Sequence, residues 1–74
     1  MKVKFSTPKE TKEFQAKSIK LDTGKGILVI YPNHTDAIIK LAKNSKIYID
    51  SNEYKVNMGI VKIEKNKALI VADI

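Results

Sequence analysis

Apolar and polar residues alternate with a period of two along much of this chain, and this pattern limits the fold more than any other feature of the sequence. Val3 and Phe5 fall on one side of KVKFS, and Tyr54, Val56 and Met58 fall on one side of EYKVNM. Because successive side chains of a β-strand point to opposite faces, such segments predict strands with one buried face. Short strands separated by turns every eight to twelve residues or so, about the spacing of all-β domains, predict a sandwich or a small barrel.

Turn-forming residues separate the predicted strands. The segment TGKG at 23–26 predicts a turn, because glycine tolerates positive φ. Ser51-Asn52 predicts a tight hairpin between SKIYID and EYKVNM, and Lys65-Asn66-Lys67 predicts another between IVKIE and ALIVAD. Gly-Lys-Gly in the first turn lacks the following Lys-Ser/Thr of a phosphate-binding loop, so we expect a plain turn there.

Two segments depart from simple alternation. Phe14 and Ala16 occupy even positions, whereas Ile19 and Leu21 occupy odd ones, so a bulge or a corner is expected near residues 17–18. The segment ILVIY at 27–31 is apolar at both parities, which predicts a strand covered on both faces.

A third segment favours another structure. TDAIIKLAK at 35–43 carries apolar residues at helical spacing, with Thr35 as a candidate N-cap. The pattern alone therefore predicts a short helix there.

The chain is short and has no covalent staple. Its 74 residues allow one domain, residues 1–74, and such a chain buries only about 60% of the surface of its unfolded form. Without cysteine, stability must come from packing, from a partner, or from both. No apolar stretch approaches the roughly 20 residues of a membrane helix. The start, MKVKFSTPKE, lacks the apolar region of a secretory signal, so we expect a cytoplasmic protein.

The positive charge is carried entirely by lysine and is concentrated early in the chain. Residues 1–46 hold ten lysines and four acidic residues, whereas residues 47–74 hold four of each. Such an excess can attract phosphates through counterion release. Nucleic-acid readers, however, rely on arginine and on exposed aromatic side chains, and this chain has no arginine. A solvated lysine-rich surface is the favoured interpretation. The alternative is a lysine-rich small β-barrel that binds single-stranded nucleic acid.

Several stretches resemble one known family. Residues 29–39, VIYPNHTDAII, are similar to the Gly-Ile-x-Pro-Gly-His-x-Pro-Leu-Leu of the N-terminal β-sandwich domain of the epsilon subunit of F-type ATP synthases, called delta in mitochondria. MGIVKI at 58–63 and ALIVAD at 68–73 resemble the family's Gly-Gly-x-x-Glu-Val and Val-x-Val-Leu-Ala-Asp. KVKFSTPKETKEFQAKSIKL at 2–21 resembles its opening strands and Thr/Ser-Pro turn, so the resemblance is collinear over essentially the whole chain.

The resemblance implies a fold and a role. The fold is all-β, a small antiparallel β-sandwich of two packed sheets with about eight to ten short strands. Residues 37–42 would then be a strand followed by a turn, in place of the helix. Family domains lie in the central stalk against the gamma subunit and the polar loops of the membrane c-ring. We therefore expect a non-catalytic rotor component that helps couple proton- or sodium-driven rotation to ATP synthesis. It would bind gamma and the c-ring, carry no cofactor, and lie peripheral to the inner or plasma membrane.

The chain departs from the family pattern at four positions. Asn33 replaces the glycine before the histidine, and asparagine tolerates the left-handed conformation better than most residues. Asp36 replaces a proline, and Met58 replaces the first of two glycines. Ile27 replaces an acidic residue that lies near the c-ring in many members, which weakens the case for a family-like ring contact. Family members also continue past the counterpart of Ile74 into a helical hairpin, whose inhibitory and ATP-binding properties are not assigned to this chain.

The candidate site is a partner interface rather than a reaction centre. His34 is the only histidine and there is no cysteine, so a catalytic or metal role would lack partners. No catalytic, metal or cofactor-binding residue is predicted. Tyr31 and Pro32 either anchor a partner or simply end a strand. Met58 either packs in the core, which is favoured, or faces a partner. The predicted interface comprises Ile27, Tyr31, Pro32, Asn33, His34 and Met58.

Overall fold

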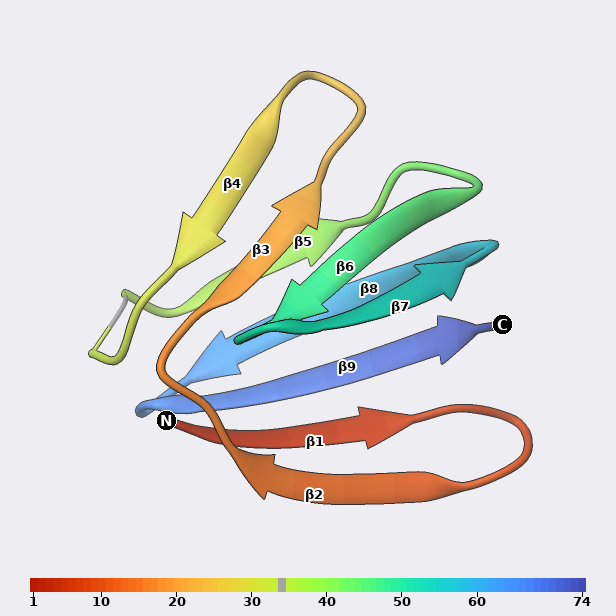
Figure 1. Ribbon diagram of the computed structural model, residues 1–74. Helices are drawn as coiled ribbons and strands as arrows, with labels where there is room; N and C mark the ends of the chain where they lie inside the picture. The colour runs from red at the N-terminus through yellow and green to blue at the C-terminus, as the bar shows by residue number, and fades with distance from the viewer. Residues whose placement is uncertain (34) are drawn as a thin grey trace.

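The computed structural model describes residues 1–33 and 35–74, and over these residues the chain forms nine β-strands and no helix (Figure 1). The strands are β1 (Lys2–Ser6), β2 (Thr11–Gln15), β3 (Ile19–Asp22), β4 (Ile27–Ile30), β5 (Ala37–Lys40), β6 (Ser45–Ile49), β7 (Asn52–Val56), β8 (Met58–Glu64) and β9 (Lys67–Asp73). They form a five-stranded sheet, β2-β1-β9-β8-β5, and a four-stranded sheet, β4-β3-β6-β7. The predicted all-β sandwich of two sheets is confirmed.

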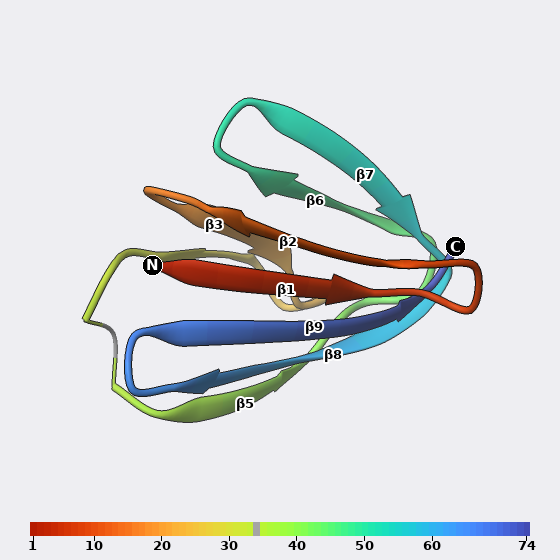
Figure 2. The same ribbon diagram turned by 90° about the horizontal axis from the view of Figure 1, so that it is seen from below.

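The first and the last strand of the chain are neighbours inside the five-stranded sheet. All neighbouring strands pair antiparallel except β1 and β9, which run parallel with Val3 opposite Ala68 and Phe5 opposite Ile70. In Figure 2, β1, β9, β8 and β5 lie side by side, and β6 and β7 of the second sheet lie above them in the view. Because β9 lies at the centre of its sheet, the last strand contributes to the core as much as the first.

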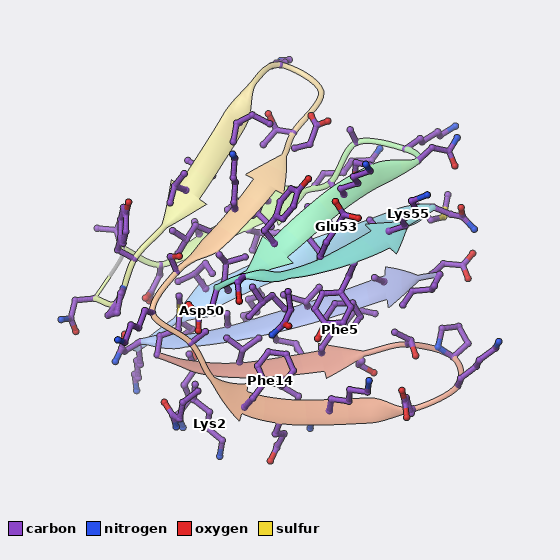
Figure 3. All side chains as sticks on the ribbon, viewed as in Figure 1. Lys2, Phe5, Phe14, Asp50, Glu53 and Lys55 are labelled. Carbon is purple, nitrogen blue, oxygen red and sulfur yellow. The ribbon has the colours of Figure 1, made fainter. Side chains whose placement is uncertain are left out.

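The core lies between the sheets and follows the predicted alternation. In β9 the residues Ala68, Ile70 and Ala72 are buried, and the residues between them are exposed. The ring of Phe5, labelled in Figure 3, packs on Tyr54 of the opposite sheet with 4.9 Å between ring centroids. The buried apolar side chains are Val3, Phe5, Ala16, Ile19, Leu21, Ile30, Leu41, Ile47, Ile49, Val56, Val61, Ile63, Ala68, Ile70 and Ala72.

The change of parity between Phe14 and Ile19 is a corner at which the chain changes sheets. β2 belongs to the five-stranded sheet and β3 to the four-stranded sheet, so the expected corner near residues 17–18 is confirmed. Asp50, labelled in Figure 3, holds this corner. Its Oδ1 accepts hydrogen bonds from the backbone N–H groups of Lys17 at 2.8 Å and Ser18 at 3.1 Å.

The helix expected over residues 35–43 is wrong, and the strand implied by the resemblance is confirmed. β5 pairs antiparallel with β8, with Ile39 opposite Val61, at the edge of the five-stranded sheet. The backbone N–H of Leu41 then donates to the carbonyl of Gly59 at 2.9 Å. Pairing with a neighbouring strand therefore overrides the local helical spacing of the apolar residues.

The predicted turns are present, one of them displaced. In the 23–26 turn, the N–H of Thr23 donates to the carbonyl of Gly26 at 3.0 Å, and Gly24 has a φ of 83°. Ile49 pairs with Asn52, so the hairpin turn is Asp50-Ser51 and begins one residue earlier than predicted. The last turn, Lys65-Asn66, has φ values of 49° and 60°, the left-handed pair of a tight hairpin turn.

Candidate functional site

The first exposed apolar surface runs along β4. Ile27, Val29 and Tyr31 are 59%, 39% and 62% exposed, whereas Ile30 between them is fully buried. The prediction that this segment is covered on both faces is wrong, because β4 is an edge strand and its outer face has no cover in the described part of the chain. These three side chains are called the β4 stripe.

The corner that follows β4 is bound to the β8–β9 turn. Pro32 and Asn33 are exposed, and Asn33 has a φ of 67°, the left-handed conformation that asparagine tolerates. The N–H of Asn33 donates to Oδ1 of Asn66 at 2.8 Å, and the N–H of Lys65 donates to Oδ1 of Asp36 at 3.2 Å. The corner is therefore braced against a second loop. His34 lies outside the described residues.

A second exposed apolar surface lies on the outer face of the five-stranded sheet. Ile38, Met58, Ile60 and Val71 are 73%, 53%, 50% and 51% exposed, and Ile60 lies directly opposite Val71. These four side chains are called the sheet patch. Three of them border an open groove of about 610 Å³, whose full lining is Ser6, Thr7, Pro8, Lys40, Leu41, Lys43, Met58, Gly59, Ile60, Val71, Ala72 and Asp73.

Met58 is exposed, so the favoured expectation that it packs in the core is wrong. Val56 is buried, but the chain changes sheets at Asn57, so Met58 does not continue the alternation of Tyr54 and Val56. The N–H of Asn57 donates to the carbonyl of Asp73 at 2.7 Å, and its carbonyl accepts from the N–H of Asn44 at 2.9 Å. Met58 therefore begins β8 on the outside of the opposite sheet.

The structure divides the predicted interface. Ile27, Tyr31, Pro32 and Asn33 lie together along β4 and the corner that follows it. Met58 lies in the other sheet, at the start of β8. The corner after β4 lies near the opposite end of β8, so Met58 is far from it (Figures 1 and 2).

Three members of the sheet patch, Ile38, Ile60 and Val71, were not among the predicted residues. A signal for two of them was present in the sequence. IVKIE and ALIVAD are apolar at adjacent positions, so a strand with one buried face leaves apolar side chains on the other face.

The acidic side chains are dispersed over the described part of the chain. Within residues 1–33 and 35–74, no three His, Cys, Asp or Glu side chains gather as metal ligands. Among the described residues, the one resolved pKa shift is that of Tyr48, whose hydroxyl donates to Oε1 of Glu53 at 3.0 Å. This hydrogen bond raises the pKa of Tyr48 above 10.0, and desolvation and the charge of Glu53 act in the same direction, while Lys46 opposes them. Tyr48 of β6 lies directly opposite Glu53 of β7, so this hydrogen bond links the two strands of a hairpin. No stretch of the described chain forms a helix suited to crossing a membrane.

Comparison with known proteins agrees with this architecture. The chain is 34% identical over 73 residues to the ATP synthase epsilon chains of Clostridium botulinum strains Hall and Langeland, a match that covers 93% of this chain and 55% of each relative. The chain thus spans about half the length of these relatives. A chain in the cryo-EM structure of the Tetrahymena thermophila mitochondrial ATP synthase central stalk and c-ring has the same fold, with a TM-score of 0.87 and 18% identity. That match covers 99% of this chain and 63% of the other.

The family comparison covers the whole sequence. The model of the family described as "ATP synthase, Delta/Epsilon chain, beta-sandwich domain" matches residues 1–74. This agrees with the resemblance carried by residues 29–39, 58–63 and 68–73. The chain therefore belongs to the β-sandwich domain family of the ATP synthase delta/epsilon chain.

Proposed function

We propose that this domain is a non-catalytic component of the central stalk of an F-type ATP synthase, peripheral to the membrane, and that it binds the gamma subunit and the c-ring. It performs no chemistry itself and takes no cofactor. Its role is to transmit rotation between the ring and the stalk and so to help couple ion flow to ATP synthesis. Family membership and the exposed sheet patch support this proposal.

Gamma binds at the sheet patch. If the domain and gamma rotate together as one body, the interface between them must be stable. Stable interfaces have an apolar centre with a polar rim. The groove beside the patch is lined by the apolar Met58, Ile60 and Val71 and also by Lys40 and Lys43. Exposed apolar groups gathered on one sheet face are uncommon in a protein that acts alone. The sheet patch is the observation that carries the proposal.

The c-ring meets the corner after β4. The polar loops of the ring fit a polar, projecting surface better than a broad apolar face. The corner offers exposed Pro32 and Asn33, with exposed Tyr31 beside them. The hydrogen bonds from Asn33 to Asn66 and from Lys65 to Asp36 tie Asn33 and Asp36 to the β8–β9 turn. Residues that are already held in place lose little conformational entropy on docking. Ile27 in the β4 stripe then supplies an apolar contact at the position where many family members carry an acid.

Size-exclusion chromatography with purified gamma, with and without purified c-ring, tests the proposal. The 74-residue chain should co-elute with gamma alone and with a gamma–ring complex. Tyr31→Ala should weaken retention by the ring and leave retention by gamma intact, with the far-ultraviolet circular dichroism spectrum unchanged. Failure of the folded chain to co-elute with gamma would overturn the proposed function. If Tyr31→Ala unfolds enough to explain its weaker retention by the ring, the assignment of the corner to the c-ring interface fails.

A further inference from the structure

A second groove, lined mainly by lysines, lies on the same outer sheet face as the sheet patch. Its volume is about 500 Å³, and its lining is Lys2, Lys4, Glu13, Lys62, Glu64, Lys65, Lys67, Ala68 and Leu69. Five lysines face two glutamates there, which leaves a net charge of +3. This surface is called the lysine groove. It accounts for a large part of the chain's charge excess and has no part in the proposed gamma contact.

The lysines of this groove are gathered on adjacent strands and are mostly without ion pairs. Lys2 in β1 lies directly opposite Lys67 in β9, and Lys4 lies opposite Leu69. Among the described residues, Lys62 is the only groove lysine in an ion pair, with Nζ 3.4 Å from Glu64. Like charges placed directly opposite on neighbouring strands destabilise a sheet. An anion bound at the groove would relieve that repulsion.

The lysine groove reaches the same end of the molecule as the corner after β4. Figure 3 shows Lys2 at this end, and the backbone N–H of Lys2 donates to the carbonyl of Asn66 at 3.3 Å. Asn66 in turn accepts from Asn33 of the corner, and exposed Tyr31 precedes that corner. Lysines and an exposed aromatic side chain therefore share one end of the domain, a combination suited to the boundary of a membrane.

All the lysines of the groove are close enough to attract an anionic surface that touches this end of the domain. Lys4 and Lys62 lie two residues along their strands from Lys2 and Glu64, a setback of about 7 Å at a rise of about 3.3 Å per residue. This is within the Debye length of about 8 Å at physiological ionic strength, so the recessed lysines still attract an anionic surface.

The shape and chemistry of the groove favour an extended anionic surface over nucleic acid. Single-stranded nucleic acid is held by aromatic stacking platforms, and no aromatic side chain or arginine lines the groove in the part of the chain that the structure describes. The groove's lysines are all exposed, so it lacks the buried polar anchors of a small-molecule site. Flexible lysines on an open surface match the diffuse charge of phospholipid headgroups.

We propose that the lysine groove docks this end of the domain onto the anionic phospholipid headgroups of a membrane surface. The contact is electrostatic and reversible, without insertion of any strand. It uses side chains other than those of the sheet patch, of which Ile38 lies directly opposite Lys62 and the other three lie farther along the sheet face. A domain whose corner meets a membrane ring would present this same end to the surrounding headgroups.

Co-sedimentation with protein-free vesicles tests the inference. The 74-residue chain is mixed with vesicles of equimolar phosphatidylglycerol and phosphatidylcholine, or of phosphatidylcholine alone, at low and at high salt. The test variant is Lys2→Gln/Lys65→Gln/Lys67→Gln. The matched control, Lys9→Gln/Lys25→Gln/Lys55→Gln, removes the same charge from exposed lysines outside the groove; Figure 3 shows Lys55 at the opposite end from Lys2.

The unmodified chain should bind only the anionic vesicles and should be released by salt. Each lysine near an anionic leaflet raises the partition coefficient about fivefold, so the test variant should bind on the order of 100-fold more weakly. The control variant should lose much less. No binding to the anionic vesicles, or equal loss in both variants, would overturn the inference. Tighter binding of a single-stranded oligonucleotide with the same lysine dependence would also overturn it, in favour of a nucleic-acid site. None of these outcomes bears on co-elution with gamma.

Discussion

Replacing Met58, Ile60 and Val71 together by threonine should weaken binding to gamma without weakening the fold. The three side chains point outward from β8 and β9, and none belongs to the buried core. Threonine retains the branching that suits an exposed strand position for two of the three. We therefore expect the free energy of unfolding to change by no more than about 0.5 kcal/mol per site, as for ordinary surface substitutions.

The expected loss of affinity follows from the exposure of these side chains. Complete burial of such a side chain contributes about 1.5–3 kcal/mol relative to full exposure. Met58, Ile60 and Val71 are 53%, 50% and 51% exposed, so docking can bury only about half of each. That is about 1 kcal/mol per side chain and about 3 kcal/mol in total, or on the order of 100-fold in Kd.

The β4 stripe supplies a matched control. Ile27, Val29 and Tyr31 are exposed to a similar degree, 59%, 39% and 62%, on the opposite sheet. Isothermal titration calorimetry with purified gamma should show the loss for Met58→Thr/Ile60→Thr/Val71→Thr and little change for Ile27→Thr/Val29→Thr/Tyr31→Thr. An unchanged Kd for the first variant while it stays folded, or an equal loss for the second, would refute the assignment of gamma to the sheet patch.

Three further changes probe the fold itself. Asp50→Ala removes the acceptor for two backbone N–H groups at the corner where the chain changes sheets. Urea denaturation should show that the free energy of unfolding falls by about 1–2 kcal/mol, and by less for Asp50→Asn. Gly59→Ala would place a Cβ 2.8 Å from the carbonyl oxygen of Val71, so the urea midpoint should fall by the equivalent of about 1–3 kcal/mol; an unchanged midpoint would contradict the packing. Glu53→Gln should lower the pKa of Tyr48 toward 10.0 in a tyrosinate absorbance titration. Because the hydrogen bond favours the neutral phenol, its contribution to stability is present below pH 10.0 and is lost as the pH rises through the higher folded-state pKa.

Local sequence signals were sufficient for most strands and turns, with β5 as the exception, because its apolar spacing predicted a helix. The alternation at Val3 and Phe5 placed both in the core, as observed, and Lys65-Asn66 has the paired left-handed conformation of a tight hairpin. These features depend on residues close in sequence, where the period of two and the backbone preferences of asparagine act directly. The parity change before Ile19 also indicated a corner, although not that the chain enters a second sheet there.

The candidate site was harder to predict because exposure depends on which strand lies at an edge. The apolar run that includes Ile27 and Val29 has the composition of a strand covered on both faces, yet its edge position leaves one face open. Met58 continued the spacing of Val56, but the change of sheets at Asn57 reversed which way the side chains point. Sheet membership is set by contacts between distant residues, such as β1 with β9, which alternation alone does not specify.

The central claim is that gamma covers the sheet patch on the outer face of the five-stranded sheet, and single engineered cysteines test it most directly. The 74-residue sequence has no cysteine, so Ile60→Cys and Ile27→Cys each carry one reactive thiol, at positions that are 50% and 59% exposed. The rate of maleimide labelling is measured for each variant with and without saturating gamma. Labelling at position 60 should slow sharply when gamma is present, while labelling at position 27 should continue unchanged. Equal labelling at position 60 with and without bound gamma would contradict the account.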